Sequence, residues 1–423
     1  MKEVLILSYF YPPCTLTAAQ RPAGWVKYLH TFGYRPTVIT RSWENEIRTP
    51  EDQLKNSGTE TLITTGEHFD VHILPYTASY RDQLFNSSSK LVKKTSKILT
   101  LVNAIGENFS NRFIPFRNMY DYASLLIKQR DFACLIITGN PFIQFRFGYL
   151  LHKKFNIPWI ADYRDDWTTS EIIKPKGILQ KITHQLQQKA EQKWVGSAFA
   201  ITSVSPVYTN RISDYVNVPG YTILNGFDEL RSPSLSIDSS VFTITYNGTL
   251  YDTQDLESVV EVFLECIDLY KDKINIKINF PGIAFDKHQS NRLKKIIKGY
   301  ETFFYITTRL LKDQVIEIQS VSDLLLMLTH RNIKGIPSSK LFEYLSFQKP
   351  IICFPSDHDI VEEILQDTNM GMIANNKEQL FAYISNSIDN KLKNNYSFFE
   401  CGNSNLQNYH IKAQTKKMAS LLK

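Results

Sequence analysis

Four polar residues stand together where an apolar helix pattern begins: Ser338, Ser339, Lys340 and Glu343. A lysine in the first turn of a helix is locally unfavourable, because the helix N-terminus already carries partial positive charge. The free N–H groups of such a terminus, preceded by a serine cap, form a common binding site for phosphate. Lys340 becomes favourable there once a diphosphate is bound, and Glu343, one turn further, can accept hydrogen bonds from ribose hydroxyls. The spacing therefore predicts a nucleoside diphosphate site.

The same segment is also compatible with an ordinary amphipathic helix. Its apolar side would be Leu341, Phe342 and Leu345, and Lys340 and Glu343 would form a surface pair that contributes about 0.2–0.5 kcal/mol. The context favours the site, because the segment follows a strand pattern and ligands of open parallel sheets bind beyond the carboxyl ends of the strands.

Short apolar runs alternate with helical patterns along most of the 423 residues. Many runs are rich in Val, Ile, Leu and Phe without strict alternation, which is typical of parallel strands covered by helices on both faces. The alternation occurs twice and predicts an α/β fold with two doubly wound domains. The expected strands are Val4–Phe10, Thr37–Thr40, Val71–Pro75, Leu135–Thr138, Trp159–Tyr163, Phe199–Val204, Tyr221–Leu224, Phe242–Asn247, Ile274–Phe280, Thr302–Thr307, Asp323–Leu328 and Pro350–Phe354.

A polar, Pro- and Ser-rich stretch at Asp228–Ser240 is the expected linker between the two domains. We therefore expect a first domain at residues 1–228 and a second at residues 239–404.

Amino-acid composition limits the partners and the cellular location that we expect. The apolar content of 43% is that of a globular protein, and the formal charge of +6 permits anionic ligands without requiring nucleic acid, which we do not expect as a partner. The five cysteines are scattered without metal-ligand or redox spacing, which favours a reducing cytosol. No uncharged stretch reaches the roughly 18–20 residues that span a bilayer. We expect a cytoplasmic protein that is soluble or peripheral.

Several motifs, in their order along the chain, resemble family four glycosyltransferases with the GT-B fold. The resemblance covers most of the chain, and the segment Pro158–Trp167 (PWIADYRDDW) is similar to bacterial members that build surface polysaccharides, such as O-antigen or capsule. The other motifs are SYFYPP at Ser8–Pro13 with Arg21-Pro22, NGFD at Asn225–Asp228, YNGTL at Tyr246–Leu250, and PSSKLFEYL at Pro337–Leu345 followed by Lys349-Pro350.

The resemblance implies two Rossmann-like domains that face a central cleft, with a final helix at residues 405–423 packing back on the first domain. The donor would be a nucleotide diphosphate-sugar held by the second domain, with no further cofactor and no metal. Lys340, with the backbone of Ser338 and Ser339, would bind the diphosphate, and Glu343 the ribose. Gly248 and Thr249 would lie against the diphosphate or sugar, and Arg309 near the base or phosphates.

The acceptor would bind to the first domain. Arg21, Asn140, Arg164 and Asp165 are the candidate acceptor contacts, and Asp162 is a catalytic candidate beside Lys340 and Glu343. The stretch around Asp162 is equally compatible with an ion-paired turn in which Asp165 or Asp166 caps the next helix. The expected activity is retaining, metal-independent transfer of a sugar to a glycan or lipid-linked glycan.

The sequence departs from the family pattern in two places. The loop after the first strand lacks the usual Gly-Gly pair and has Pro12, Pro13 and Arg21 instead. The segment that opens the second domain lacks the usual Arg and Lys, and either Arg309 or Arg331 can substitute.

Three alternatives remain open. A sugar-nucleotide epimerase and a non-catalytic sugar-binding module would share the GT-B fold. The Asp357-His358-Asp359 segment has the form of a metal-binding DxD motif, although capping of a helix at Ile360–Leu365 explains it more simply.

A further hypothesis concerns Ser87–Ile105, a basic amphipathic pattern with Lys90, Lys93, Lys94 and Lys97 on one side. This pattern suits either packing on the first domain or contact with the inner face of the cell membrane.

Overall fold

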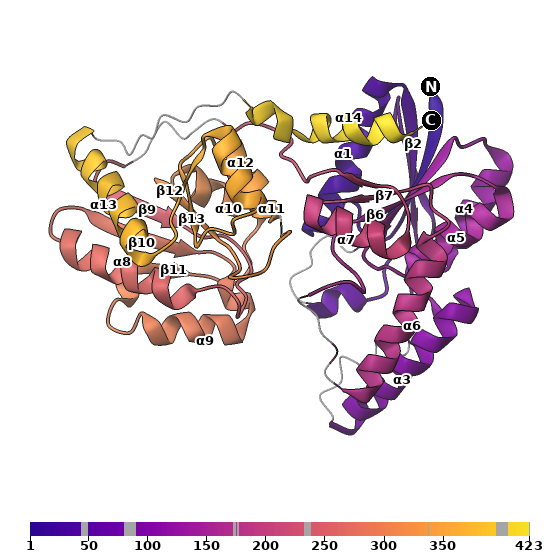
Figure 1. Ribbon diagram of the computed structural model, residues 1–423, viewed down its shortest axis with the longest axis horizontal. Coiled ribbons are helices and arrows are strands. Elements are labelled where there is room, and N and C mark those ends of the chain that lie inside the picture. The colour runs from indigo at the N-terminus through magenta and orange to yellow at the C-terminus, as the bar shows by residue number, and fades with distance from the viewer. Residues whose placement is uncertain are drawn as a thin grey trace. The chain divides into compact units, whose positions relative to one another are not determined.

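The computed structural model describes residues 1–43, 50–79, 90–171, 175, 177–231, 238–336, 338–394 and 405–422, and for residues 50, 51 and 90–98 it describes the backbone only. The chain forms two compact units. The first comprises Met1–Leu224 together with Ile411–Lys423, and the second comprises Asn225–His410. Each unit is an α/β domain with its own sheet (Figure 1).

The first unit is built on an eight-stranded sheet in the order β3-β4-β2-β1-β5-β6-β7-β8. All neighbouring strands are parallel except β3 and β4. Buried apolar runs form the central strands, because both faces of a parallel sheet are covered by helices. The strands are β1 (Lys2–Leu7), β2 (Tyr34–Arg41), β3 (Leu62–Thr65), β4 (Asp70–Leu74), β5 (Cys134–Gly139), β6 (Trp159–Tyr163), β7 (Ala200–Ser203) and β8 (Gly220–Thr222).

The helices of the first unit include one from the end of the chain. Helix α14 packs against α1, and its Met418 and Ala419 share a core cluster with Trp25 and Val26. The family resemblance implied this final helix and its return to the first domain. The helices are α1 (Gln20–Tyr28), α3 (Lys90–Phe109), α4 (Asn118–Gln129), α5 (Gln144–Phe155), α6 (Ile178–Val195), α7 (Pro206–Val216) and α14 (Ile411–Leu421).

The second unit has a six-stranded, fully parallel sheet in the order β11-β10-β9-β12-β13-β14. Its strands are β9 (Val241–Thr245), β10 (Asn275–Phe280), β11 (Phe304–Ile306), β12 (Leu324–Leu328), β13 (Ile351–Phe354) and β14 (Gly371–Ile373). Its helices are α8 (Leu256–Tyr270), α9 (Lys287–Ile296), α10 (Lys312–Ser320), α11 (Ser339–Ser346), α12 (Ile360–Thr368) and α13 (Lys377–Asn394).

All twelve expected strands are present, with two additions. Strand β3 escapes the pattern because all of its residues are exposed and it pairs antiparallel with β4, so no buried apolar run marks it. Strand β14 has only three residues, all half-buried. The first expected strand also ends at Leu7 rather than at Phe10.

Strand order reverses once in each sheet, and ligands of doubly wound sheets bind at this point. In the first unit the reversal lies between β1 and β5, and in the second between β9 and β12. The loops after these four strands are therefore the places where side chains can meet a ligand.

Candidate functional site

Lys340 lies at the point in the second unit where the strand order reverses. Its ammonium donates hydrogen bonds of 2.8 Å to the Tyr246 hydroxyl and 2.8 Å to the Thr249 carbonyl, both in the loop after β9. The nitrogen also lies 4.3 Å from the centre of the Tyr246 ring. The side chain thus crosses from the start of α11 to the loop after a strand of the sheet.

The start of α11 is a capped helix terminus. Ser338 has extended backbone angles, and its hydroxyl accepts a hydrogen bond of 3.3 Å from the Lys340 backbone N–H. The other side of the helix is fixed to the same loop, because the buried Tyr344 hydroxyl accepts a bond of 2.9 Å from the Asn247 N–H. Helix α11 and the loop after β9 are therefore held rigidly together. We call these two segments, residues 338–344 and 246–249, the Lys340 corner.

Gly248 is required in that corner for two reasons. Its φ of +97° lies in the left-handed region, which strains residues with a side chain. A Cβ added there would also come within 2.7 Å of Lys340 Cε. The Asn247-Gly248-Thr249 turn is thus shaped to let the lysine side chain pass over the backbone.

The Lys340 charge is poorly compensated. Burial lowers the pKa of Lys340 to about 7, and the Glu343 carboxylate opposes this shift by attracting the ammonium. Both side chains are half-buried, and the described residues form no ion pair with Lys340. A multiply charged anion at this corner would supply the missing counter-charge.

His330 follows β12 and lies close enough to respond to Lys340. Its Nδ1 is 2.6 Å from the Thr253 hydroxyl, and its ring centre is 5.4 Å from that of Tyr251. Burial, followed by the charge of Lys340, lowers the pKa of His330. A neutral His330 therefore borders the Lys340 corner at ordinary pH.

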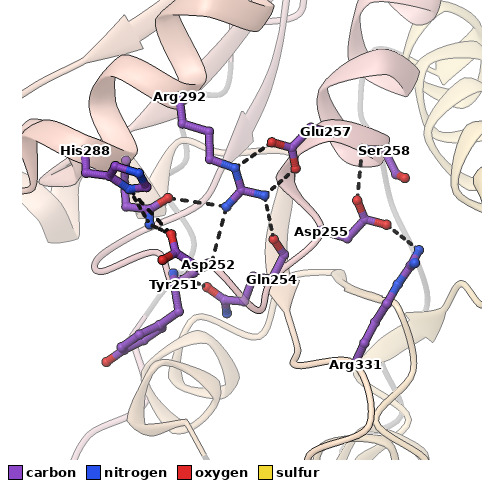
Figure 2. A network of polar contacts seen from close by, with 10 residues as sticks. Tyr251, Asp252, Gln254, Asp255, Glu257, Ser258, His288, Arg292 and Arg331 are labelled. Carbon is purple, nitrogen blue, oxygen red and sulfur yellow. Dashed lines mark hydrogen bonds and ion pairs between the residues drawn. The ribbon is translucent and has the colours of Figure 1, made fainter. Parts of the chain in front are cut away.

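The loop that continues from Thr249 into α8 is held by a polar network (Figure 2). Arg292 of α9 pairs with Glu257 and donates a bond of 3.0 Å to the Gln254 carbonyl. The Gln254 side chain donates 2.7 Å to the Leu328 carbonyl at the end of β12. The network joins the two strand ends that carry the candidate site.

Arg331 and Arg309 are the two substitutes that the sequence left open. Arg331 is exposed and pairs with Asp255, the residue that caps α8 (Figure 2). Arg309 is exposed in the loop between β11 and α10.

The Asp357-His358-Asp359 segment is a helix cap. The Asp357 carboxylate accepts backbone bonds of 2.9 Å from Val361 and 3.1 Å from Glu362, in the first turn of α12. The described residues hold no cluster of acidic, histidine or cysteine side chains that suits a metal ion. Helix capping, the simpler interpretation of this segment, is what the two backbone bonds show.

In the first unit, Arg21 and Asp162 bind each other. Arg21 Nη2 lies 2.7 Å from Asp162 Oδ1, which also accepts 2.7 Å from the Thr202 hydroxyl. Arg21 Nη1 donates to the carbonyls of Ile223 and Leu224. Both charged side chains are buried, so this geometry differs from the expected acceptor contact and catalytic role and favours a structural one, holding α1, β6 and β7 together.

The residues after Tyr163 comprise an anchored pair and a more exposed pair. Asp166 pairs with Arg211 at 2.9 Å, and Trp167 stacks on Phe142 at 5.2 Å between ring centres. Arg164 and Asp165 pair with each other at 2.8 Å, and Asp165 is 57% exposed.

Two further side chains lie near the reversal point of the first sheet. Asn140 is exposed directly after β5. The guanidinium of Arg164 lies 5.7 Å from the ring centre of Phe10, which follows β1 and stacks on Trp43. Arg164, Asp165 and Asn140 therefore remain accessible for an acceptor, whereas Arg21 and Asp162 do not.

Sequence reasoning missed the residues that hold Lys340 in place. Tyr246 and Tyr344 look like ordinary core aromatics in the sequence, and Gln254 has no motif around it. Their roles depend on the approach of α11 to β9, which no local pattern reveals. His330 lies two positions after the end of the predicted strand Asp323–Leu328, and that position was the one available signal.

No family model and no curated protein matches the chain by sequence. Solved structures match over its whole length. HepE from Anabaena, in complex with UDP and glucose, has a TM-score of 0.62 at 12% identity and covers 100% of this chain and 99% of its own. The chain has the GT-B fold.

Two other solved structures support that assignment. Sucrose-phosphate synthase from Thermosynechococcus elongatus has a TM-score of 0.61 at 11% identity, with 100% of this chain and 98% of the other covered. A glycosyltransferase from Rickettsia africae has a TM-score of 0.56 at 12% identity, with 100% of this chain and 97% of the other covered. At these identities the likeness establishes two Rossmann-like domains of the GT-B type, as the sequence predicted.

Proposed function

We propose that the protein is a glycosyltransferase that takes a sugar from a nucleotide diphosphate-sugar. The observation that carries the proposal is the Lys340 corner, where an ammonium that forms no ion pair with the described residues stands at a capped helix start beside a glycine turn. A diphosphate fits this arrangement because the helix N–H groups and the ammonium both favour negative charge. HepE, which has the same fold, was solved with UDP and with UDP-glucose.

The proposed chemistry is departure of the diphosphate from the sugar. Negative charge grows on the leaving oxygen as the glycosidic bond breaks, and Lys340 with the α11 N–H groups would stabilise it. The acceptor hydroxyl would attack from the same face and give its proton to the leaving diphosphate, so the reaction would retain configuration without a metal. Glu343 would bind the ribose, and Ser338, Ser339, Gly248 and Thr249 would surround the diphosphate.

The acceptor would be a glycan or lipid-linked glycan of bacterial surface-polysaccharide synthesis. This finer assignment is supported by the similarity of Pro158–Trp167 to such enzymes and by the accessible pair Arg164 and Asp165 with Asn140. Contact with the inner face of the membrane belongs to the same proposal. The lysine side chains of the basic helix pattern at Ser87–Ile105 lie outside the described residues, and no described helix is long and apolar enough to cross a bilayer.

A thermal-shift panel of nucleotide-sugars tests the donor site. One donor should raise the melting temperature of the natural protein, and both Lys340→Ala and Glu343→Ala should lose that shift. Lys295→Ala, which removes an exposed lysine of α9, is the matched control and should keep it. Normal shifts in both site variants would contradict the assignment.

Product analysis separates the proposed activity from the two alternatives. A transferase releases free nucleoside diphosphate only when donor and acceptor are both present. An epimerase interconverts donors without an acceptor, and a binding module does neither. Lys340→Ala should lower the transfer rate by roughly 10²–10³-fold, the range found when one stabilising donor is removed.

A further inference from the structure

A pocket of about 380 Å³ opens on the first unit, and none of the donor or acceptor candidates lines it. Its walls come from the end of α3, the turn Asn111–Phe113, the start of α4 and one face of α5. Three arginines line it, Arg112, Arg117 and Arg146, together with one acidic residue, Asp121. The lining is therefore predominantly cationic.

The pocket is held in shape by its most buried arginine. Arg146 Nε donates a hydrogen bond of 2.9 Å to Asn111 Oδ1, and Nη1 donates 2.7 Å to the Asn108 carbonyl. These bonds tie α5 to the end of α3. Burial lowers the pKa of Arg146 without bringing its guanidinium near neutrality at physiological pH.

The other two arginines lack an ion-pair partner among the described residues. Arg112 and Arg117 are exposed, and in the described part of the chain neither side chain makes a hydrogen bond or ion pair. Asp121 forms no ion pair with them. Guanidinium groups bind phosphate oxygens through paired, parallel N–H bonds, so an anion carrying several oxygens would relieve the repulsion between the three charges.

Exposed apolar side chains lie beside the pocket. Val102, Ile105 and Phe109 are spaced to share one face of α3, and Phe109 is 82% exposed. The Phe113 ring packs on Gly106, where an added Cβ would come within 2.6 Å of it. Helix α3 projects from the body of the first unit beside α6 (Figure 1). The cationic pocket is thus continuous with an exposed apolar face on a projecting helix.

We propose that this pocket binds the anionic phosphate headgroup of a lipid at a membrane surface, with the apolar face of α3 entering the interface. A small soluble phosphate would use the arginines but would leave Phe109 and its neighbours in water. An amphiphile uses both features, because basic residues attract anionic headgroups and apolar side chains enter the acyl boundary. The proposal rests on the proposed function in that it assigns a surface to the membrane contact included there, and its test does not require glycosyl transfer.

Vesicle sedimentation of the full chain at low salt tests it, without any nucleotide-sugar. Vesicles of phosphatidylcholine mixed with phosphatidylglycerol should pellet the protein, and vesicles of phosphatidylcholine alone should not. Because a basic residue near an anionic bilayer contributes a factor of roughly five, R112A with R117A should lower partitioning by about 25-fold. K153A with K154A removes the same amount of charge from exposed lysines of α5. This control variant should lower partitioning into the vesicles much less.

Three further measurements separate the sources of binding. Phe109→Ala should weaken vesicle binding but leave any melting-temperature shift by inorganic phosphate unchanged. Vesicles of phosphatidylcholine with oleate carry their net negative charge on a carboxylate instead of on the phosphate of an anionic phospholipid, and equal binding to them would overturn phosphate recognition. A shift by inorganic phosphate without vesicle binding, or no binding to either probe, would overturn the lipid assignment. Circular dichroism of each variant confirms that the fold is intact.

Discussion

Arg21 in the first unit and Lys340 in the second are both cations near the carboxyl ends of parallel strands, and their surroundings differ. Arg21 is buried against Asp162, and its remaining donors reach the carbonyls of Ile223 and Leu224. Lys340 is half-buried, and its hydrogen-bond partners are a neutral hydroxyl and a carbonyl. A cation that the fold has already neutralised holds structure together, whereas a cation that forms no ion pair with the described residues is available to an anionic ligand.

Removing the first cation should produce the largest effect on stability. Arg21→Met leaves the Asp162 carboxylate buried without its partner, which should lower the free energy of unfolding by about 3–5 kcal/mol. Urea denaturation measures this change. Adding Asp162→Asn removes the unpaired charge and should recover much of the loss. A single variant as stable as the natural protein would contradict the structural role of the pair.

The second cation should make donor binding depend on pH. The pKa of Lys340 is lowered to about 7 in the free protein, and a bound diphosphate favours the protonated form, so binding takes up a proton above that pH. Donor affinity should therefore be constant at lower pH and fall by up to about tenfold per pH unit above it. Calorimetric titration measures the affinity at each pH.

Lys340→Arg supplies the control for this prediction, because a guanidinium stays protonated throughout the range. That variant should bind with an affinity that hardly changes with pH. An unchanged, steep pH dependence in Lys340→Arg would assign the titration to another group, with His330 the nearest candidate on the described chain.

A smaller effect is expected from a substitution at Gly248, in the turn over which the Lys340 side chain lies. Gly248→Ala combines a φ of +97° with a Cβ against Lys340, and should cost about 1–2 kcal/mol of stability and displace the ammonium from Tyr246. Gly299→Ala is matched to it, since Gly299 has a φ of +92° and nothing within 4 Å of an added Cβ. Both variants should lose stability, and only Gly248→Ala should weaken donor binding. Equal donor affinities would argue against the Lys340 corner as the site.

Much of the fold was predictable because buried parallel strands leave a strong local signal. The boundaries of β6 match the expected Trp159–Tyr163, and both doubly wound sheets were anticipated. The exposed strand β3 left no such signal. The first unit ends at Leu224 rather than at residue 228, because Asn225–Asp228 packs with the second unit, where Phe227 bridges to His410.

The candidate site was predictable to the extent that its residues break local rules. Lys340 in a first helical turn is such a case, and its place after β12 followed from the strand pattern. Arg21 and Asp162 were equally conspicuous, yet they lie 141 positions apart, and no pattern in the sequence indicated that they bind each other. The same limit hid Tyr246 and Tyr344 as supports of the Lys340 corner.

The sequence by itself determined the elements of this protein and the types of side chain at the strand ends, because periodicity, capping and turn chemistry act over a few residues. The tertiary structure alone decided which charges are compensated, because compensation depends on contacts between distant segments. It placed Asp162 against Arg21, left Lys340 with neutral partners, and gathered Arg112, Arg117 and Arg146 around one pocket.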